Sequence, residues 1–280
     1  MFKKNETNMK LKNYGEFINE AWLEGVNNMA NYNRMIDYTL LDNNATTEDI
    51  IQLCEKARIM NVKSVCVMPK HVHVAAEELD KTDVLVCTVI SFPEGTNTLQ
   101  QKIAETSQAI QDGADEIDMV LDYQYFKKEW NDTAKDGGDL EIGKSQKLVE
   151  EVSELVRICH ANENKDGDKI TLKVIVESGL LTPKQTKLAT IVCLEGGADF
   201  IKTSTGKVAI GAEVDKVKIM RDTIDENIEE FYNMQIKVSG GVRTLQDIKK
   251  YEPYDVGRYG MGYAAVDALN GIEGKSDSSY

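Results

Sequence analysis

Short apolar runs alternate with amphipathic segments along most of this chain of 280 residues. Each apolar run has the length of a strand, and each amphipathic segment repeats apolar residues every three to four positions, as one face of a helix requires. The run 84–90 is almost wholly apolar, which is typical of a strand buried on both faces of a sheet. Strands are predicted in eight runs: 35–40, 63–68, 84–90, 116–121, 171–177, within 197–207, 235–239 and 256–260.

Helix starts are marked by residues that cap a first turn. Thr98 and Thr182 each stand three residues before a glutamine, and Pro183 occupies the first helical position. Helices are predicted over 46–57, 70–79, 98–113, 145–160, 182–196, 213–228, 244–251 and 263–270. This strict alternation indicates a (β/α)8 TIM barrel of the α/β class. A doubly wound open sheet is the alternative, but no Gly-x-Gly-x-x-Gly follows the first strand, as a dinucleotide-binding domain would need.

Three segments fall outside the repeating pattern. The helical spacing of apolar residues in 13–30 predicts a helical extension over 1–33, ahead of a barrel over 34–273. Residues 274–280 are rich in glycine and serine, which predicts a flexible tail. The polar segment 122–143 is too long for an ordinary connection. It is interpreted as a surface insertion, with a partly ordered lid over a site as the alternative.

Composition narrows the range of partners. The formal net charge is −14, and such a field repels nucleic acid and anionic membrane surfaces, so neither is expected as a partner. No apolar run reaches the length that spans a bilayer. Five cysteines without close pairs favour a reducing compartment, which predicts a cytoplasmic protein. His71 and His73 lack a third ligand near them in sequence, so no metal site is expected.

A lysine stands inside a run that is otherwise typical of a core strand. Within Gly197–Lys207, Lys202 is costly to bury unless its amine finds a partner or loses its proton. The stretch Gly113–Asp118 repeats the Gly-Ala-Asp-x-Ile pattern and puts Asp118 where Lys202 falls. Because alternate strands of a barrel fill the same interior layer, these two side chains are predicted to meet. Lys237, on the next strand, is predicted to face the same interior.

Two lysines beside one aspartate suggest a nucleophilic amine. Burial and a second ammonium both disfavour the charged form of a lysine, so Lys202 beside Lys237 is a candidate for a neutral amine that forms a Schiff base with a carbonyl substrate. Asp118 would then transfer protons. The alternative is a buried ion pair that only supports the barrel, but such a pair does not need a surplus positive charge.

Glycines at the ends of three consecutive strands suggest a phosphate site. Glycine lets backbone N–H groups approach an anion, and barrels commonly bind phosphate in the loops after their last strands. Glycine is also frequent in tight turns, so it is the clustering that favours a site. The candidate substrate-binding residues are Thr205, Gly206, Lys207, Gly240, Gly241, Arg243, Gly260 and Gly262.

Together, these ordered motifs resemble those of the deoxyribose-phosphate aldolase family, over about residues 34–269. The resemblance rests on segments 36–41, 64–67, 92–93, 113–118, 173–177, 197–206 and 237–244. It implies that Lys202 forms the Schiff base, that Lys237 lowers the pKa of Lys202, and that Asp118 relays protons. Further residues that the resemblance places around the substrate are Asp37, Thr39 and Cys66.

Two features toward the C-terminus bear on this resemblance. The tail ends in Tyr280, and the resemblance implies that a terminal tyrosine assists proton transfer; a disordered terminus without a role is the alternative. After the last strand, where the family often has serines, this chain has Gly262 and Tyr263. That departure leaves open how the last strand contributes to phosphate binding.

The resemblance predicts a class I aldolase, a lyase of deoxyribose phosphate catabolism. Such an enzyme reversibly cleaves 2-deoxy-D-ribose 5-phosphate to acetaldehyde and D-glyceraldehyde 3-phosphate, without a metal or organic cofactor. One alternative is a class I aldolase with a different phosphorylated aldehyde acceptor. Another is a non-catalytic phosphosugar-binding barrel. A homodimer is also left open.

Overall fold

A computed structural model describes residues 29, 31–129, 142–229 and 231–272. Eight parallel strands form a closed barrel in which every strand pairs with its neighbours in sequence, and β8 pairs with β1. The TIM barrel predicted from the alternating pattern is therefore confirmed, and the open sheet is excluded. The strands are β1 (Ile36–Leu40), β2 (Ser64–Val67), β3 (Leu85–Ile90), β4 (Glu116–Val120), β5 (Thr171–Ile175), β6 (Phe200–Lys202), β7 (Gln235–Ser239) and β8 (Val256–Gly262).

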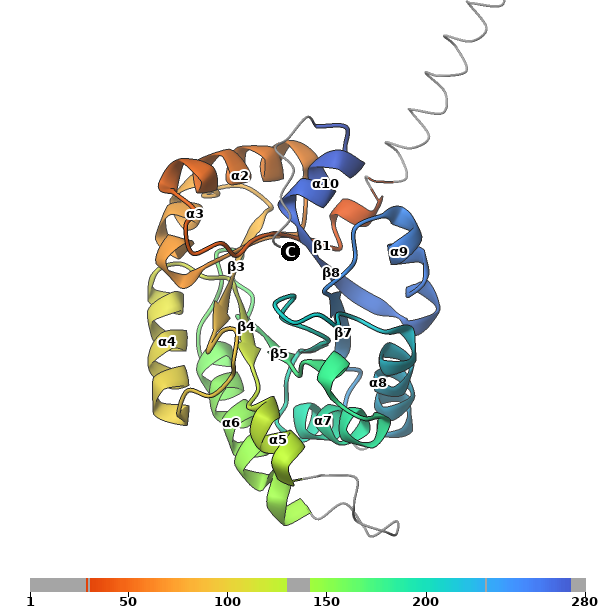
Figure 1. Ribbon diagram of the computed structural model, residues 1–280. Helices are drawn as coiled ribbons and strands as arrows, with labels where there is room; N and C mark the ends of the chain where they lie inside the picture. Colours follow the sequence, from red (N-terminus) through yellow and green to blue (C-terminus); the bar gives the residue numbers. More distant parts are fainter. Residues whose placement is uncertain (1–28, 30, 130–141, 230, 273–280) are drawn as a thin grey trace, which may run out of the picture.

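Helices surround the barrel and cover its outer face (Figure 1). Outward side chains of the strands, such as Ile117, Val174 and Ile201, are fully buried in the apolar layer between strands and helices. The labelled helices are α2 (Thr47–Met60), α3 (Val72–Glu78), α4 (Leu99–Gln111), α5 (Tyr123–Glu129), α6 (Ile142–His160), α7 (Pro183–Glu195), α8 (Val214–Glu226), α9 (Leu245–Lys249) and α10 (Tyr263–Leu269). Among the described residues, no helix is both long and apolar enough to cross a membrane.

Helix starts follow the capping rules closely. Thr98 and Thr182 each accept a hydrogen bond from the backbone N–H three residues on, and the side-chain oxygen of the glutamine there accepts one from the backbone N–H of the threonine. The same reciprocal box forms at Thr46 and Thr244, with an aspartate as the partner. Each box satisfies N–H groups that a helix start leaves without an intrahelical acceptor.

The segment 122–143 differs from its prediction as one long polar connection. It begins with the helix α5, and α6 starts at Ile142 rather than at 145. Asp122 accepts a hydrogen bond from the backbone N–H of Tyr125, and Phe126 is fully buried. The local cap and the apolar contact explain why this part of the segment is helical. Residues 130–141 lie outside the described part of the chain.

Two other expectations fall wholly or mainly outside the described residues. They are the N-terminal helix over 13–30, of which only Met29 is described, and the tail 274–280 with Tyr280. At the other boundary, β8 runs to Gly262 instead of ending at 260, because its last residues pair with β1: Gly260 lies opposite Asp37 and Gly262 opposite Thr39.

The repeated Gly-Ala-Asp sequence has the same structural task in both places. Asp115 accepts a hydrogen bond from the backbone N–H of Val86, at the start of β3, at 2.8 Å. Asp199 accepts one from Leu172, at the start of β5, also at 2.8 Å. Each aspartate therefore joins its own strand to the start of the preceding one. This sets β4 and β6 in equivalent positions, so that residues three further on reach the same interior.

Candidate active site

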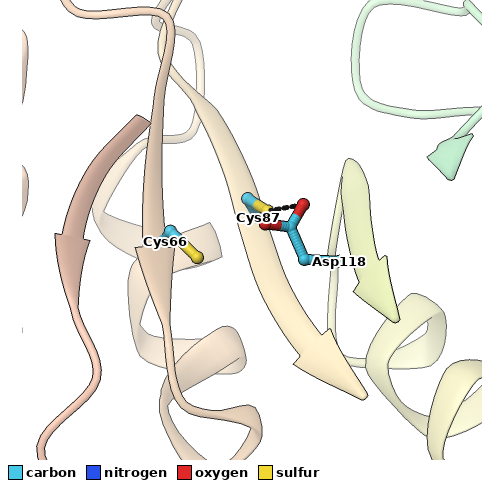
Figure 2. Close-up of side chains that lie close together, drawn as sticks. All are labelled: Cys66, Cys87 and Asp118. Atoms are coloured by element: carbon cyan, nitrogen blue, oxygen red, sulfur yellow. Dashed lines mark hydrogen bonds between the residues drawn. The ribbon is translucent and has the colours of Figure 1, made fainter. Parts of the chain in front are cut away.

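Asp118 of β4 lies at the centre of a buried cluster inside the barrel. Its Oδ2 accepts hydrogen bonds from the Nζ atoms of both Lys202 and Lys237, at 2.7 and 2.6 Å. Its Oδ1 accepts from Lys173 of β5 at 3.0 Å and from the thiol of Cys87 at 3.2 Å (Figure 2). Burial alone would raise the pKa of Asp118, but the three lysines outweigh it and hold that pKa well below its usual value. The carboxylate is therefore ionised.

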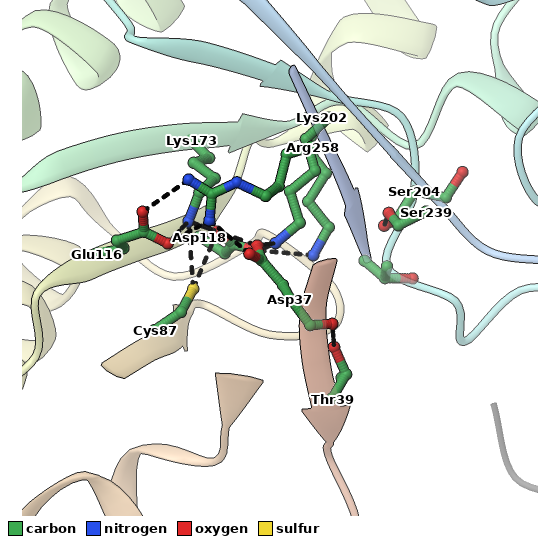
Figure 3. Close-up of polar contacts among 12 residues, drawn as sticks. Asp37, Thr39, Cys87, Glu116, Asp118, Lys173, Lys202, Ser204, Ser239 and Arg258 are labelled. Carbon is green, nitrogen blue, oxygen red and sulfur yellow. Dashed lines mark hydrogen bonds and ion pairs between the residues drawn. The ribbon is translucent and has the colours of Figure 1, made fainter. Parts of the chain in front are cut away.

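A second layer of charges lies against this centre. Arg258 of β8 donates two hydrogen bonds of 3.0 Å to the carboxylate of Glu116 and one of 2.5 Å to Asp37 (Figure 3). Lys173 donates to Glu116 at 2.8 Å, and Lys237 forms an ion pair with Asp37. Burial opposes ionisation of Asp37, yet the neighbouring cations lower its pKa below the usual range.

The cluster carries an excess of one positive charge when all its groups are ionised. Four cations face three carboxylates, and each of the seven residues is at most 5% exposed. These residues are Asp37, Glu116, Asp118, Lys173, Lys202, Lys237 and Arg258. A purely structural set of ion pairs would more simply balance, because each uncompensated buried charge costs free energy.

The three lysines are not equivalent. Lys173 lies within 4 Å of three carboxylates, and Lys237 contacts two. In the described part of the chain, Lys202 forms an ion pair with Asp118 alone, and it shares that oxygen with Lys237. Burial opposes the charges of Lys173 and Lys237, but their carboxylates raise the pKa of each above its ordinary value. The ammonium with the least carboxylate support is therefore that of Lys202.

Position in the barrel separates Lys202 from Lys173, whereas Lys202 and Lys237 lie in register. Lys202 is the last residue of β6 and lies in register with Ile175, two residues beyond Lys173 along β5. Active sites of such barrels lie at the carboxyl ends of the strands. Lys202 is thus closer than Lys173 to the end of the barrel where a substrate enters.

Comparisons with known proteins agree with this geometry. The model of the DeoC/LacD family aldolases matches residues 32–262. The chain belongs to the DeoC/LacD family of aldolases. A deoxyribose-phosphate aldolase of Mycoplasmoides pirum is 39% identical over 220 residues, which cover 79% of this chain and 88% of that protein. One from Staphylococcus saprophyticus is 37% identical over 247 residues, which cover 88% and 99%.

Two solved aldolase structures are similar to this chain over most of its length. The tetrameric deoxyribose phosphate aldolase from Aeropyrum pernix has a TM-score of 0.69 and 25% identity, with 89% of this chain and 95% of that chain covered. The aldolase QR15 has a TM-score of 0.68 and 29% identity, with 84% and 92% covered. The family that the sequence motifs predicted is confirmed, and the protein is an aldehyde-lyase by family.

The five glycines predicted at the phosphate end of this aldolase differ in their backbone and packing. Gly206, Gly240 and Gly241 have φ values of +76°, +82° and +86°, a region that favours glycine. Gly260 has a different reason to be glycine: a Cβ there would lie 2.9 Å from Cβ of Ser239 and 3.3 Å from Cε of Lys237. Gly260 therefore makes room for the lysine inside the barrel. Gly262 precedes the first turn of α10 with an ordinary φ of −60°.

The remaining predicted residues lie around the same end of the barrel. Thr205 is fully buried, and the Nζ of Lys207 donates to the backbone carbonyl of Leu41, just after β1, at 3.1 Å. The hydroxyl of Thr39 donates to the backbone carbonyl of Asp37 at 2.8 Å. The backbone N–H of Arg243 donates to Asp247.

Apolar side chains line the barrel interior near the cluster. Cys66 and Cys87 lie opposite each other in β2 and β3 and are both fully buried. With Leu41 and Val89 they form one apolar group, against which Met68 and Phe92 pack. This apolar group reaches the charged cluster at Cys87, whose thiol donates to Asp118.

Two groups of described side chains have the donor types of a metal site. One consists of Cys66, Cys87 and Asp118, and the other of Asp37, Cys87 and Glu116. All three carboxylates already bind lysine or arginine, so a metal ion would have to displace or repel those cations. The donor set therefore does not fit a metal ion.

Sequence analysis did not single out Glu116, Lys173, Arg258, Cys87 or Glu177 as candidates. A signal was present in the first two: Glu116 and Asp118 alternate with apolar residues in β4, and Lys173 does so in β5. Polar residues at every second position of a buried strand point to one face. Arg258 gave no such signal, because β8 contains several glycines and a tyrosine.

Proposed function

We propose that this protein is a class I aldolase that reversibly cleaves 2-deoxy-D-ribose 5-phosphate to acetaldehyde and D-glyceraldehyde 3-phosphate. One observation carries the proposal: Lys202 and Lys237 share a single oxygen of Asp118 inside the barrel. The family and the names of the curated relatives support the substrate.

Lys202 is the nucleophile in this proposal. Its neutral Nζ attacks the aldehyde carbon C1 of the open-chain sugar, and loss of water from the carbinolamine gives a protonated imine. The C2–C3 bond then breaks, and its electron pair moves toward the imine, which leaves an enamine on Lys202. The hydroxyl of C3 loses its proton and becomes the aldehyde of D-glyceraldehyde 3-phosphate. Protonation of C2 and hydrolysis of the imine release acetaldehyde and regenerate Lys202.

The neighbours of Lys202 have separate roles. Lys237 is the nearby cation that favours the neutral amine at Lys202, since two ammonium groups on one oxygen repel each other. Asp118 holds both nitrogens and is the group that moves protons to and from the carbinolamine. Tyr280, which the resemblance also implies for proton transfer, lies outside the described residues.

The phosphate end is assigned to the loops after β6 and β7. Glycines with positive φ at Gly206, Gly240 and Gly241 expose backbone N–H groups, and Lys207 supplies charge. Asp37, Thr39 and Cys66 are proposed substrate neighbours on β1 and β2. Arg243, Gly260 and Gly262 are assigned to the same end, and Gly260 in addition makes room for Lys237.

The proposal extends to the location of the protein in the cell and to its oligomeric state. The five cysteines are all free and buried, which supports a reducing, cytoplasmic location. The relative from Aeropyrum pernix is a tetramer, whereas for this chain a homodimer is the proposal.

The test is to trap the imine. The protein is incubated with acetaldehyde and borohydride. The mass of the intact protein then shows whether an adduct has formed, and proteolytic mapping locates the modified residue. A reduced adduct is expected on Lys202, and Lys202→Ala should abolish it. Lys187→Ala, at an exposed lysine that pairs with Glu226, is the matched control and should keep the adduct. If the wild type gains no adduct, the Schiff-base mechanism is wrong.

Rates with several sugars separate the alternatives. Cleavage of 2-deoxy-D-ribose 5-phosphate should exceed that of other phosphorylated substrates. Faster cleavage of another phosphorylated aldol would favour an aldolase with a different acceptor. An adduct-free protein that still binds the sugar phosphate would be a non-catalytic phosphosugar-binding barrel.

A further inference from the structure

One buried carboxylate near the site belongs to none of the contacts described above. Glu177 follows β5 by two residues and is fully buried. Its φ of +51° places it in the left-handed region, which is uncommon for a residue with a side chain. Such backbone conformations persist only where surrounding contacts enforce them, and they concentrate at functional sites.

The side chain of Glu177 is bonded to the loop that follows β6. Its Oε2 accepts hydrogen bonds from the hydroxyl of Thr205 at 2.5 Å and from the backbone N–H of Thr205 at 3.2 Å. The hydroxyl of Thr205 accepts in turn from the backbone N–H of Lys207 at 3.1 Å. A continuous chain of hydrogen bonds therefore runs from Glu177 to the turn that contains Gly206.

Hydrogen bonds restrain the backbone on both sides of Glu177. The N–H of Val176 donates to the carbonyl of Lys202 at 3.1 Å, and that of Ser178 donates to Thr203 at 2.7 Å. The backbone on either side of Glu177 is thus bonded to β6 or its continuation. Burial raises the pKa of Glu177 above its usual value, and the hydrogen bonds from Thr205 offset part of this rise.

We propose that Glu177 is a positioning residue that gives the site its preference for phosphorylated over unphosphorylated substrates, by holding the turn Thr205–Lys207 in place. The inference rests on the proposed function, because it takes this turn as the phosphate end of the site. Glu177 acts through Thr205 and does not itself bind the phosphate, which its negative charge would repel.

A residue that only stabilised the fold would behave differently. Its loss would lower stability and reduce all activities alike. A residue that orders the phosphate-binding turn affects the phosphorylated substrate more, chiefly through KM. The ratio of kcat/KM for 2-deoxyribose 5-phosphate to kcat/KM for 2-deoxyribose is therefore the informative quantity.

The experiment uses the full chain and two pairs of variants. Glu177→Met and Thr205→Val remove the acceptor and the donor, whereas Glu177→Gln and Thr205→Ser keep an oxygen at each position. The first pair is expected to lower the ratio by about tenfold or more, as for loss of a charged hydrogen bond. The second pair should retain more of it. Glu55→Gln, at an exposed glutamate of α2, is the matched control and should leave the ratio unchanged.

Coupling and phosphate binding complete the test. The double variant Glu177→Met/Thr205→Val should lower the ratio by less than the product of the two single effects, because both single changes remove the bond between the Thr205 hydroxyl and the Glu177 carboxylate. Inorganic phosphate should bind about tenfold more weakly to Glu177→Met than to the wild type. An unchanged ratio together with unchanged phosphate affinity would overturn the inference.

Failure of the inference can be told apart from failure of the proposed function. If the wild type forms no borohydride adduct, the aldolase mechanism is wrong, and phosphate affinity still decides the role of Glu177. If Glu177→Met does not fold, Thr205→Val and Thr205→Ser test the same bond from its other partner.

Discussion

Replacing Lys237 by methionine tests the electrostatic basis of the mechanism. The change removes one of the two ammonium groups on Asp118 and keeps a side chain of similar length. Lys202 would then have no cation sharing its acceptor oxygen, and Asp37 would also lose a partner. Both effects stabilise the protonated form of Lys202. The acid limb of the pH–rate profile should therefore move to higher pH.

The size of this effect follows from the geometry. The two nitrogens lie 2.7 and 2.6 Å from one oxygen, so they can be no more than about 5 Å apart. At that separation two unit charges repel by about 3 kcal/mol, with the effective dielectric constant of about 20 that suits protein sites. Since about 1.4 kcal/mol corresponds to one pH unit, a shift of about two units is expected.

The assay is the rate of borohydride-trapped adduct formation with acetaldehyde, measured against pH. Lys237→Arg keeps the charge and should leave the acid limb closer to that of the wild type. Glu116→Gln removes a negative charge from the cluster and should move the limb the opposite way, to lower pH. If the limb stays in place in Lys237→Met while the adduct still forms, Lys237 does not control protonation of Lys202 and this reasoning is wrong.

Two further predictions concern stability. Lys102 of α4 donates to Glu151 of α6 at 2.6 Å, and both are buried, so Lys102→Met should lower the free energy of unfolding in urea by about 3–5 kcal/mol. The double variant Lys102→Met/Glu151→Leu should regain most of the lost free energy of unfolding, because it leaves no unpaired buried charge. If the double variant loses as much as Lys102→Met, an unpaired Glu151 is not the cause of the loss. The second prediction concerns Asp247, which caps α9. Burial would raise the pKa of Asp247, but hydrogen bonds from Lys250 and Thr244 hold that pKa at about 2. Asp247→Asn should therefore cost about 1 kcal/mol above about pH 4, and the difference should vanish as the pH falls toward 2.

The fold could be predicted because its signals are local. Most strands are short and mainly apolar runs, and each capping box needs residues only three positions apart. The repeat of Gly-Ala-Asp also gave a long-range result, the meeting of Asp118 and Lys202. That step succeeded because β4 and β6 are equivalent strands of a symmetric barrel, so equal positions in the repeat reach the same layer.

The full cluster could not be predicted in the same way. Glu116 and Arg258 are 142 residues apart, and no repeat relates β4 to β8. Their pairing depends on how the barrel closes, which sets the register between β8, β1 and β7. Gly260 illustrates the same limit. Its place beside other glycines at strand ends predicted a phosphate site, and the close approach of Lys237, which the sequence does not show, is a separate reason for a glycine there.

Charge balance connects these residues to the chemistry. The sequence suggested two lysines and one aspartate, and the structure has four cations and three carboxylates, so the excess of one positive charge is unchanged. Loss of one proton makes the buried cluster neutral. Arginine does not release a proton at physiological pH, and carboxylates hold Lys173 and Lys237 as ammonium ions. Lys202 is the remaining cation of the cluster and the last residue of its strand, which is why we propose it as the group that reacts with a substrate carbonyl.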